Sequence, residues 1–201
     1  MKTFNLVLLS AVAALTLAAT PAGAAGRVKV RGAAVNAAGG VTAGSAAAYG
    51  GPNGAAGVRA RGVTTDGAGN VSVASGARGY SPNGGSYNRS GNTTVNSDGS
   101  ASHQSGASAQ GANGGSLNSS GGFTRNADGT TSGGRSTQAN AANGASYQGN
   151  TNASNGSGSH ASSATSANGS TYNGQTDWTR GKGITHTGTC HDSAGNEIPC
   201  H

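Results

Sequence analysis

Residues 81–130 read SPNGGSYNRSGNTTVNSDGSASHQSGASAQGANGGSLNSSGGFTRNADGT and contain a turn-forming dipeptide every fifteen residues. Asn-Gly and Asp-Gly alternate, and the series runs on beyond this stretch: Asn83-Gly84, Asp98-Gly99, Asn113-Gly114, Asp128-Gly129 and Asn143-Gly144. Glycine keeps the same phase toward the N-terminus, at Gly69, Gly54 and Gly39. A fixed period of this kind is the sequence signature of a repeat protein.

The regular stretch consists of thirty-residue units, each made of an Asn-Gly half and an Asp-Gly half. A second series of Ser-Gly pairs falls seven or eight residues after the first, at Ser75-Gly76, Ser90-Gly91, Ser105-Gly106 and Ser120-Gly121. Asn-Gly and Asp-Gly favour two-residue type I′ hairpin turns, because both central residues tolerate positive φ. The pattern therefore predicts an all-β repeat, a short-strand β-meander or a β-solenoid, with turns every seven to eight residues and strands of about five or six residues.

The composition does not support a globular core. Aromatic residues make up 4% of the chain and charged residues 9%, and 38 of the 201 residues are glycine. Fully burying a large apolar side chain contributes about 1.5–3 kcal/mol, whereas ordering each residue costs about 1–2 kcal/mol. The few large side chains cannot offset that cost, so the chain is either a stacked β-array or largely disordered as a monomer.

The large side chains that are present also follow the long period. Tyr87, Leu117 and Tyr147 are thirty residues apart, and Val63 and Phe123 are sixty apart with a threonine midway between them. Equal spacing in a stacked array would place such residues in ladders on one face. Duplication of an ancestral unit predicts the same spacing whether or not the chain folds.

The N-terminal residues have the features of a Sec-type signal peptide. Lys2 precedes an apolar run from 6 to 19, and Ala22-Gly23-Ala24 offers the small residues that signal peptidase recognises. The run is too short to span a bilayer. We expect cleavage after Ala24 and a secreted, cell-surface or periplasmic protein. The sequence then divides into a signal peptide (1–24), a basic Ala/Gly-rich segment (25–62), a repeat region (63–177) and a C-terminal Cys/His cassette (178–201).

Both cysteines lie in the C-terminal cassette. Cys190 and Cys200 flank a turn-forming segment, and in an exported chain such a pair most simply forms one disulfide. The alternative is a metal site for zinc or copper, for which sulfur and nitrogen donors are suited. Its candidate ligands are His186, Cys190, His191, Cys200 and His201.

The chain is basic, with a formal net charge of +6. Cations concentrate near the N-terminus of the mature chain, at Arg27, Lys29, Arg31, Arg59 and Arg61. A cluster of this kind predicts adhesion to an anionic polysaccharide or to extracellular DNA, with ordinary solubility charge as the alternative.

No sequence motif indicates catalysis or a cofactor. No GxSxG elbow frames any serine, and GxGxxG patterns carry no information at this glycine content. Asp98 and Asp128 occupy turn positions, and about one aspartate per thirty residues is too few for calcium. We therefore expect a protein that is not an enzyme and binds no cofactor.

The exported leader, the NGGS and DGS turns and the closing segment THTGTCHDSAGNEIPCH resemble a group of small, exported, uncharacterised proteobacterial repeat proteins. The chain also loosely resembles curlin-type functional amyloid subunits, which are exported, glycine-rich strand-turn repeats, although its unit of fifteen differs from theirs. The resemblance and the composition together predict a self-associating structural protein of the cell surface or biofilm matrix. An extracellular adhesin for polysaccharide, nucleic acid or ice is the alternative, and a periplasmic metal-binding protein is a weaker one.

Overall fold

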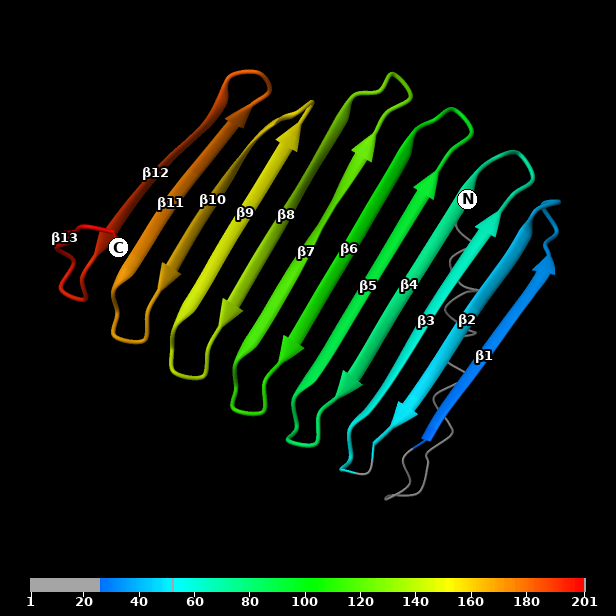
Figure 1. Cartoon of the computed structure of the whole chain (residues 1–201), viewed down its shortest axis with the longest axis horizontal. Helices are drawn as coiled ribbons and strands as arrows, with labels where there is room; N and C mark the ends of the chain where they lie inside the picture. Colours follow the sequence, from blue (N-terminus) through cyan, green and yellow to red (C-terminus); the bar gives the residue numbers. More distant parts are fainter. Residues whose placement is uncertain (1–25, 52, 201) are drawn as a thin grey trace.

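The protein is a single open β-sheet in which every strand pairs with its neighbours in the sequence (Figure 1). The structure, a computed structural model, describes residues 26–51 and 53–200, so the predicted signal peptide lies outside the described residues. The first eight strands are β1 (Gly26–Val35), β2 (Val41–Gly50), β3 (Ala56–Thr65), β4 (Val71–Tyr80), β5 (Ser86–Val95), β6 (Ala101–Gln110), β7 (Ser116–Arg125) and β8 (Thr131–Asn140). They are followed by β9 (Ser146–Ser154), β10 (Ser157–Thr165), β11 (Thr171–Thr179), β12 (Gly183–His191) and β13 (Glu197–Ile198). The predicted all-β meander is confirmed, and one sheet takes in strands of the N-terminal segment, of the repeats and of the cassette.

The predicted turn spacing of seven to eight residues is wrong, and the repeated strands are longer than the five or six residues predicted. Strands β1 to β8 have ten residues each, so one strand and one turn together fill the fifteen-residue period. The Ser-Gly pairs lie in the middle of strands, where Gly76 pairs with Ser90 and Gly106 with Ser120. Glycine in these pairs keeps an ordinary extended backbone, because none of them is among the residues with positive φ.

The Asn-Gly and Asp-Gly dipeptides do form the turns, but the turns are not type I′. In the segment 81–85, the Gly84 N–H donates to the Ser81 carbonyl at 3.1 Å, and the Ser81 N–H donates to the Gly85 carbonyl at 2.7 Å. Only the glycine has positive φ, with a value of 86° at Gly84. This is a three-residue loop, a type I turn followed by a left-handed glycine. Asn83 therefore keeps an ordinary backbone, and the glycine alone supplies the unusual conformation.

One hairpin is the two-residue type that the sequence suggests. Asn155 and Gly156 have φ values of 51° and 83° and join Ser154 directly to Ser157. Both positive φ values are what a type I′ turn requires. The shorter turn and the nine-residue strands β9 and β10 explain why the repeat contracts after Gly144.

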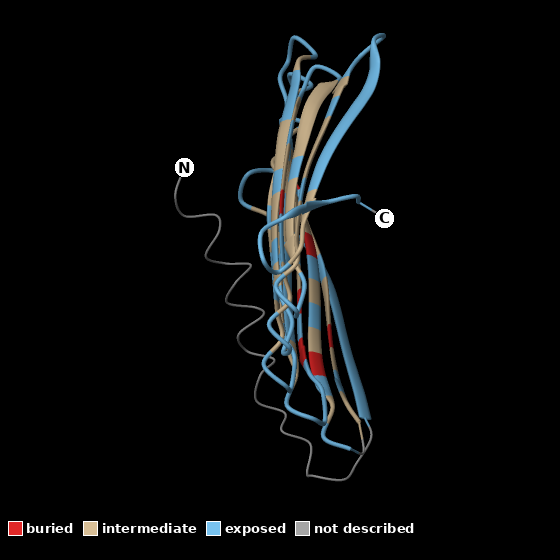
Figure 2. Ribbon diagram, turned by 90° about the vertical axis from the view of Figure 1, so that its left-hand side faces the viewer, coloured by how far each residue is buried: buried red, intermediate tan, exposed pale blue. Residues whose placement is uncertain are grey.

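The sheet is one layer thick, and both of its faces are open to solvent (Figure 2). In the described part of the chain, the only buried hydrophobic residues are Ala47 and Ala77, at 5% and 7% exposure. Large apolar residues stay exposed, including Phe123 at 51% and Ile184 at 75%. Most domains bury such a face against a second layer. Here the strands are held by backbone hydrogen bonds and turns, as the lack of core-forming residues predicts.

Candidate functional site

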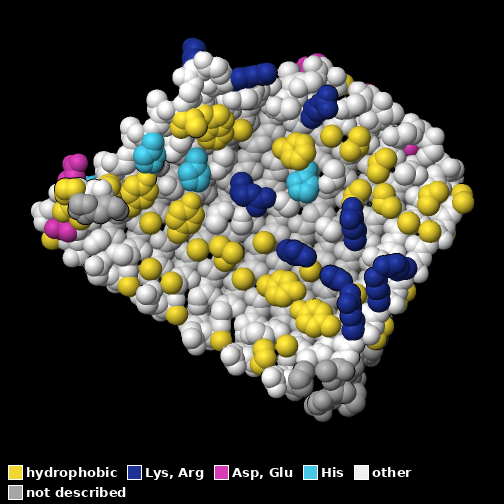
Figure 3. Space-filling view, in the orientation of Figure 1, with side chains coloured by type: hydrophobic (Ala, Val, Ile, Leu, Met, Phe, Trp, Pro, Cys, Tyr) yellow, Lys and Arg dark blue, Asp and Glu magenta, His cyan; other side chains and the backbone are white. Residues whose placement is uncertain are grey.

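The register assigns every strand residue to one of two faces, because cross-strand partners share a face and successive residues alternate. All Lys and Arg side chains of the strands except Arg78 point to the same side, which we call the basic face (Figure 3). Its cations are Arg27, Lys29, Arg31, Arg59, Arg61, Arg89, Arg125 and Arg135. The opposite side is called the polar face.

The five cations predicted from the sequence all lie on the basic face, on β1 and β3. Lys29 and Arg59 stand on either side of Ala47, and Arg31 and Arg61 stand on either side of a serine of β2. The repulsion of Arg31, followed by desolvation and by the charges of Arg27 and Arg59, lowers the pKa of Lys29. The positive charges of this cluster therefore act on one another rather than on acidic partners.

Three further cations of the basic face, Arg89, Arg125 and Arg135, were missed by the sequence reasoning. Arg89 occupies the row of Lys29 and Arg59, separated from Arg59 by Ala77. These three cations are thirty residues apart, so the repeat period itself could have identified the third one. Arg135 has no such signal, and the register alone places it on the same face, in the row next to that of Arg89.

A shallow groove of about 610 Å³ runs across the strands between these cations. Its charged and titratable lining residues are Lys29, Arg59, Arg61, Arg89, His103 and Arg135. Small residues form its floor, including the buried Ala47 and, farther along, Gly76 and Ala107. Arg135 is held in place because its Nη1 donates to Ser119 Oγ at 2.9 Å and its Nη2 to Ser105 Oγ at 2.7 Å. The groove combines positive charge with a floor free of bulky side chains.

No acidic side chain points from a described strand to the basic face. Of the six acidic residues in the chain, four aspartates lie in turns. Asp177 and Glu197 belong to strands but point to the polar face. Within its turn, the Asp66 carboxylate accepts hydrogen bonds from the Asn70 side chain and from the Ala68 N–H, and these bonds lower its pKa. The pKa of Asp98, Asp128 and Asp192 is lowered in the same way.

Tyrosines border the basic groove and lie flat over glycines of the next strand. An added Cβ at Gly57 would stand 2.5 Å from the Tyr49 ring, and one at Gly79 would stand 2.5 Å from the Tyr87 ring. The two rings reach toward each other over β3 and β4, and their hydroxyl groups are 3.4 Å apart. The hydrogen bond with Tyr87, followed by desolvation, raises the pKa of Tyr49. The predicted same-face alignment of Tyr87, Leu117 and Tyr147 is confirmed, but a strand separates each from the next.

Three histidines of the basic face form the same cross-strand pair with threonine. The Thr93, Thr151 and Thr176 hydroxyls each lie 2.8 Å from the Nδ1 atom of the partner histidine. The histidines are His103, His160 and His186. His103 also stacks on Phe123, with ring centroids 5.7 Å apart. These pairs orient the three imidazoles on the basic face.

The predicted disulfide between Cys190 and Cys200 is present, with a Cα–Cα distance of 5.4 Å. It uses both sulfur atoms of the proposed metal ligand set. His186 and His191 are five residues apart on β12 and therefore point to opposite faces. No group of three His, Cys, Asp or Glu residues suited to a metal ion is found within the described residues, and His201 lies outside them.

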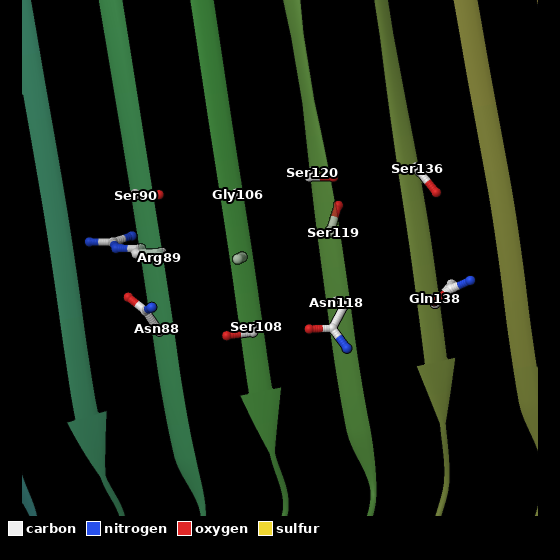
Figure 4. A pocket seen from close by; sticks show the side chains of 11 residues that line it. Asn88, Arg89, Ser90, Gly106, Ser108, Asn118, Ser119, Ser120, Ser136 and Gln138 are labelled. Atoms are coloured by element: carbon white, nitrogen blue, oxygen red, sulfur yellow. The ribbon is translucent and has the colours of Figure 1, made fainter.

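The polar face carries amides and hydroxyls where the basic face carries cations. Asn88, Ser108, Asn118 and Gln138 lie side by side on β5 to β8 (Figure 4). They line a shallow depression of about 370 Å³. Arg78 is the lone strand cation on this face among the described residues, which makes it a natural reference for the cations opposite.

Both outer edges of the sheet carry unpaired backbone. Within the described residues, β1 pairs with β2 alone, and β12 pairs with β13 only at Cys190 and His191. The outer edge of β12 is therefore open from Gly183 to Thr189. Unpaired edges of this length are templates for the addition of another strand.

The described part of the chain holds no helix with the length and apolar character needed to cross a membrane. No protein-family model, curated protein sequence or solved structure matches the chain.

Proposed function

We propose that this protein is an exported structural protein whose sheets join edge to edge into fibres at the cell surface or in a biofilm matrix. The observation that carries the proposal is the pair of open edges, β1 and β12, at opposite ends of one meander. The strand that would follow β12 in the meander would run in the direction of β1. A second copy can therefore continue the sheet head to tail, and a contact of this kind does not close on itself.

The hydrogen-bonding pattern of the two edges supports this continuation. The Asn36 N–H donates to the Gly40 carbonyl, so alternation along β1 turns the N–H of Ala33 away from β2. The Asp192 N–H donates to the Asn196 carbonyl, so the same alternation turns the N–H of Ile184 outward from β12. Ala33 and Ile184 belong to one row of side chains across the sheet. Continued in register, they would face each other as a hydrogen-bonded pair.

Charge favours head-to-tail joining over the pairing of two β1 strands. β1 carries Arg27, Lys29 and Arg31 on one face, and antiparallel pairing centred on Lys29 would set Arg27 opposite Arg31. Like charges directly opposite each other destabilise a strand pair. β12 contains no Lys or Arg. Mixed pairing of β12 with β1 therefore avoids the repulsion.

The test uses two Ala→Pro variants of the chain from residue 25 to 201. Ala33→Pro removes an outward N–H from β1 without removing a bond to β2, so the monomer should fold and fibre growth should slow at least tenfold. Ala112→Pro is the matched control, because position 112 corresponds to Pro82 in the equivalent turn, and it should grow like the parent. Growth is followed by light scattering and electron microscopy, and folding by far-ultraviolet circular dichroism. A parent chain that stays monomeric on ageing, or an Ala33→Pro variant that grows at the parental rate, contradicts the proposal.

A second candidate function is adhesion to a polyanion, and the basic face favours it. The face gathers cations from β1, β3, β5, β7 and β8 without an acidic strand residue among them. Edge-to-edge growth would leave this face free. The two functions use different parts of the sheet and are compatible in one fibre.

A further inference from the structure

We infer that the groove on the basic face binds a linear acidic polysaccharide that lies across the strands, with its anionic groups widely spaced along the polymer. This inference rests on the adhesion function and adds the class of ligand, its direction and the residues that contact it. The row that carries it contains Lys29 on β1, Arg59 on β3 and Arg89 on β5.

The distance between the cations indicates how far apart the anionic groups of the ligand lie. Neighbouring strands lie about 4.8 Å apart, so cations on every second strand are separated by about 9.6 Å. Ala47 and Ala77 occupy the intervening strands and leave the floor low between the charges. A polysaccharide with one carboxylate on every second sugar ring presents charges at a comparably wide interval.

Hydroxyl groups accompany the cations in a second row of the same face. Ser45, Ser75 and Ser105 are thirty residues apart and stand on β2, β4 and β6. Arg31 and Arg61 alternate with the first two of these serines across the strands. Sugar hydroxyls need donors and acceptors close to the charged contacts, and this row supplies them.

The same geometry fits nucleic acid less well. Each strand of a duplex carries one phosphate per about 3.4 Å of helix axis, a charge density that cations about 9.6 Å apart do not match. A sheet of this width cannot enter a major groove about 12 Å wide. Proteins that bind single strands stack successive bases on aromatic rings. In the Lys29 row, alanines rather than aromatic residues separate the cations. Tyr49 and Tyr87 lie in a neighbouring row, with their hydroxyl groups turned toward each other.

The experiment measures binding of hyaluronan oligosaccharides, which carry one carboxylate per disaccharide, in the Ala33→Pro background at low salt. Fibre growth is expected to be at least tenfold slower in that background, so binding measured on the fresh monomer is independent of growth. Arg89→Gln should weaken binding about two- to fivefold, as expected for one exposed charge contact. Arg59→Gln combined with Arg89→Gln should weaken it about tenfold. The matched control is Arg78→Gln, which removes one charge from the polar face and should leave the affinity within twofold.

Oligothymidylate and a DNA duplex of equal total charge serve as competing probes. Tighter binding of hyaluronan than of either nucleic acid supports the inference. Tighter binding of nucleic acid overturns the choice of ligand while leaving adhesion intact, and equal losses in Arg78→Gln and Arg89→Gln overturn the assignment to the basic face. Absence of binding to all three probes contradicts the adhesion function itself.

Discussion

At the scale of single residues, glycine has two separate uses in this sheet. In the turns, Gly99 and its equivalents adopt a positive φ that other residues rarely tolerate. Within strands, Gly57, Gly79 and Gly158 leave room for an aromatic ring of the neighbouring strand to lie flat on the backbone. The rings of Tyr49 and Tyr87 cover backbone that has no second layer of protein above it. This arrangement substitutes in part for a hydrophobic core.

The space that strand glycines leave for aromatic rings can be tested by two substitutions in β4. Gly79→Ala should lower the free energy of unfolding by about 1–3 kcal/mol, because its Cβ would overlap the Tyr87 ring and the substitution overpacks the site. Gly76→Ala is the control, since the nearest atom to its Cβ is the Arg89 carbonyl oxygen at 3.7 Å. It should be neutral or stabilising by up to about 1 kcal/mol. Urea unfolding of the monomers measures both values, and equal effects of the two substitutions would contradict the role of the ring.

At the scale of strands and turns, the fifteen-residue period corresponds to one strand and one turn, and two such periods make the thirty-residue repeat unit. A ten-residue strand begins on one face and ends on the other, so residues fifteen apart fall on opposite faces and residues thirty apart on the same face. Successive hairpins reverse at alternate ends of the strands, so Asp98-Gly99 and Asp128-Gly129 lie along one border of the sheet and Asn83-Gly84, Asn113-Gly114 and Asn143-Gly144 along the other. This explains why Lys29, Arg59 and Arg89 share a row.

The C-terminal hairpin is an element that depends on its disulfide. β13 has two residues, and its pairing covers only the end of β12. Replacing Cys190 and Cys200 by serine should release β13, because the loop closure contributes about 2–3 kcal/mol locally. Hydrogen exchange should then accelerate at 190–198 and stay unchanged in β4 to β8. Fibre growth should also accelerate, because the open edge of β12 becomes longer.

Growth that is slower in the double serine variant would show that β13 contributes to joining rather than blocking it. Retained protection at 190–198 would show that the two backbone pairs suffice without the disulfide. A parent chain with the disulfide reduced by dithiothreitol is the matched comparison and should behave like the variant.

At the scale of the whole molecule, the described sheet is a single layer with two open faces and almost no interior (Figure 2). Within the described part of the chain, only Ala47 and Ala77 are buried hydrophobic residues. Stability must therefore come mainly from the ladders and turns that connect neighbouring strands, as in other repeat arrays.

The single-layer sheet predicts a small heat capacity change on unfolding. Heat capacity increases on unfolding because apolar surface becomes hydrated, and little such surface is buried here. The heat capacity change should lie well below the usual value of about 12–15 cal/mol/K per residue. Calorimetry on the Ala33→Pro variant at several concentrations measures it. A value in the usual range, independent of concentration, would mean that a face is covered within the monomer.

The sequence by itself determined the all-β class, the absence of a core and the turns at the Asn-Gly and Asp-Gly dipeptides, whereas the turns expected at the Ser-Gly pairs were wrong. These depend on local chemistry, because Asn-Gly and Asp-Gly favour reversal of the chain and the composition lacks apolar volume. The disulfide also followed from the spacing of Cys190 and Cys200. The five N-terminal cations were identified as a group, although the sequence did not show that they share a face.

Only the tertiary structure decided the strand length, the turn type and the membership of each face. A Ser-Gly pair such as Ser90-Gly91 has turn chemistry, but ten-residue pairing across both neighbours holds it in a strand. Once the register is set, the alternation of side chains places Arg89 in the same row as Arg59, with Ala77 between them, and places Arg78 on the opposite face. Side chains alternate at every residue, so a face depends on register, and register depends on pairing between distant parts of the chain.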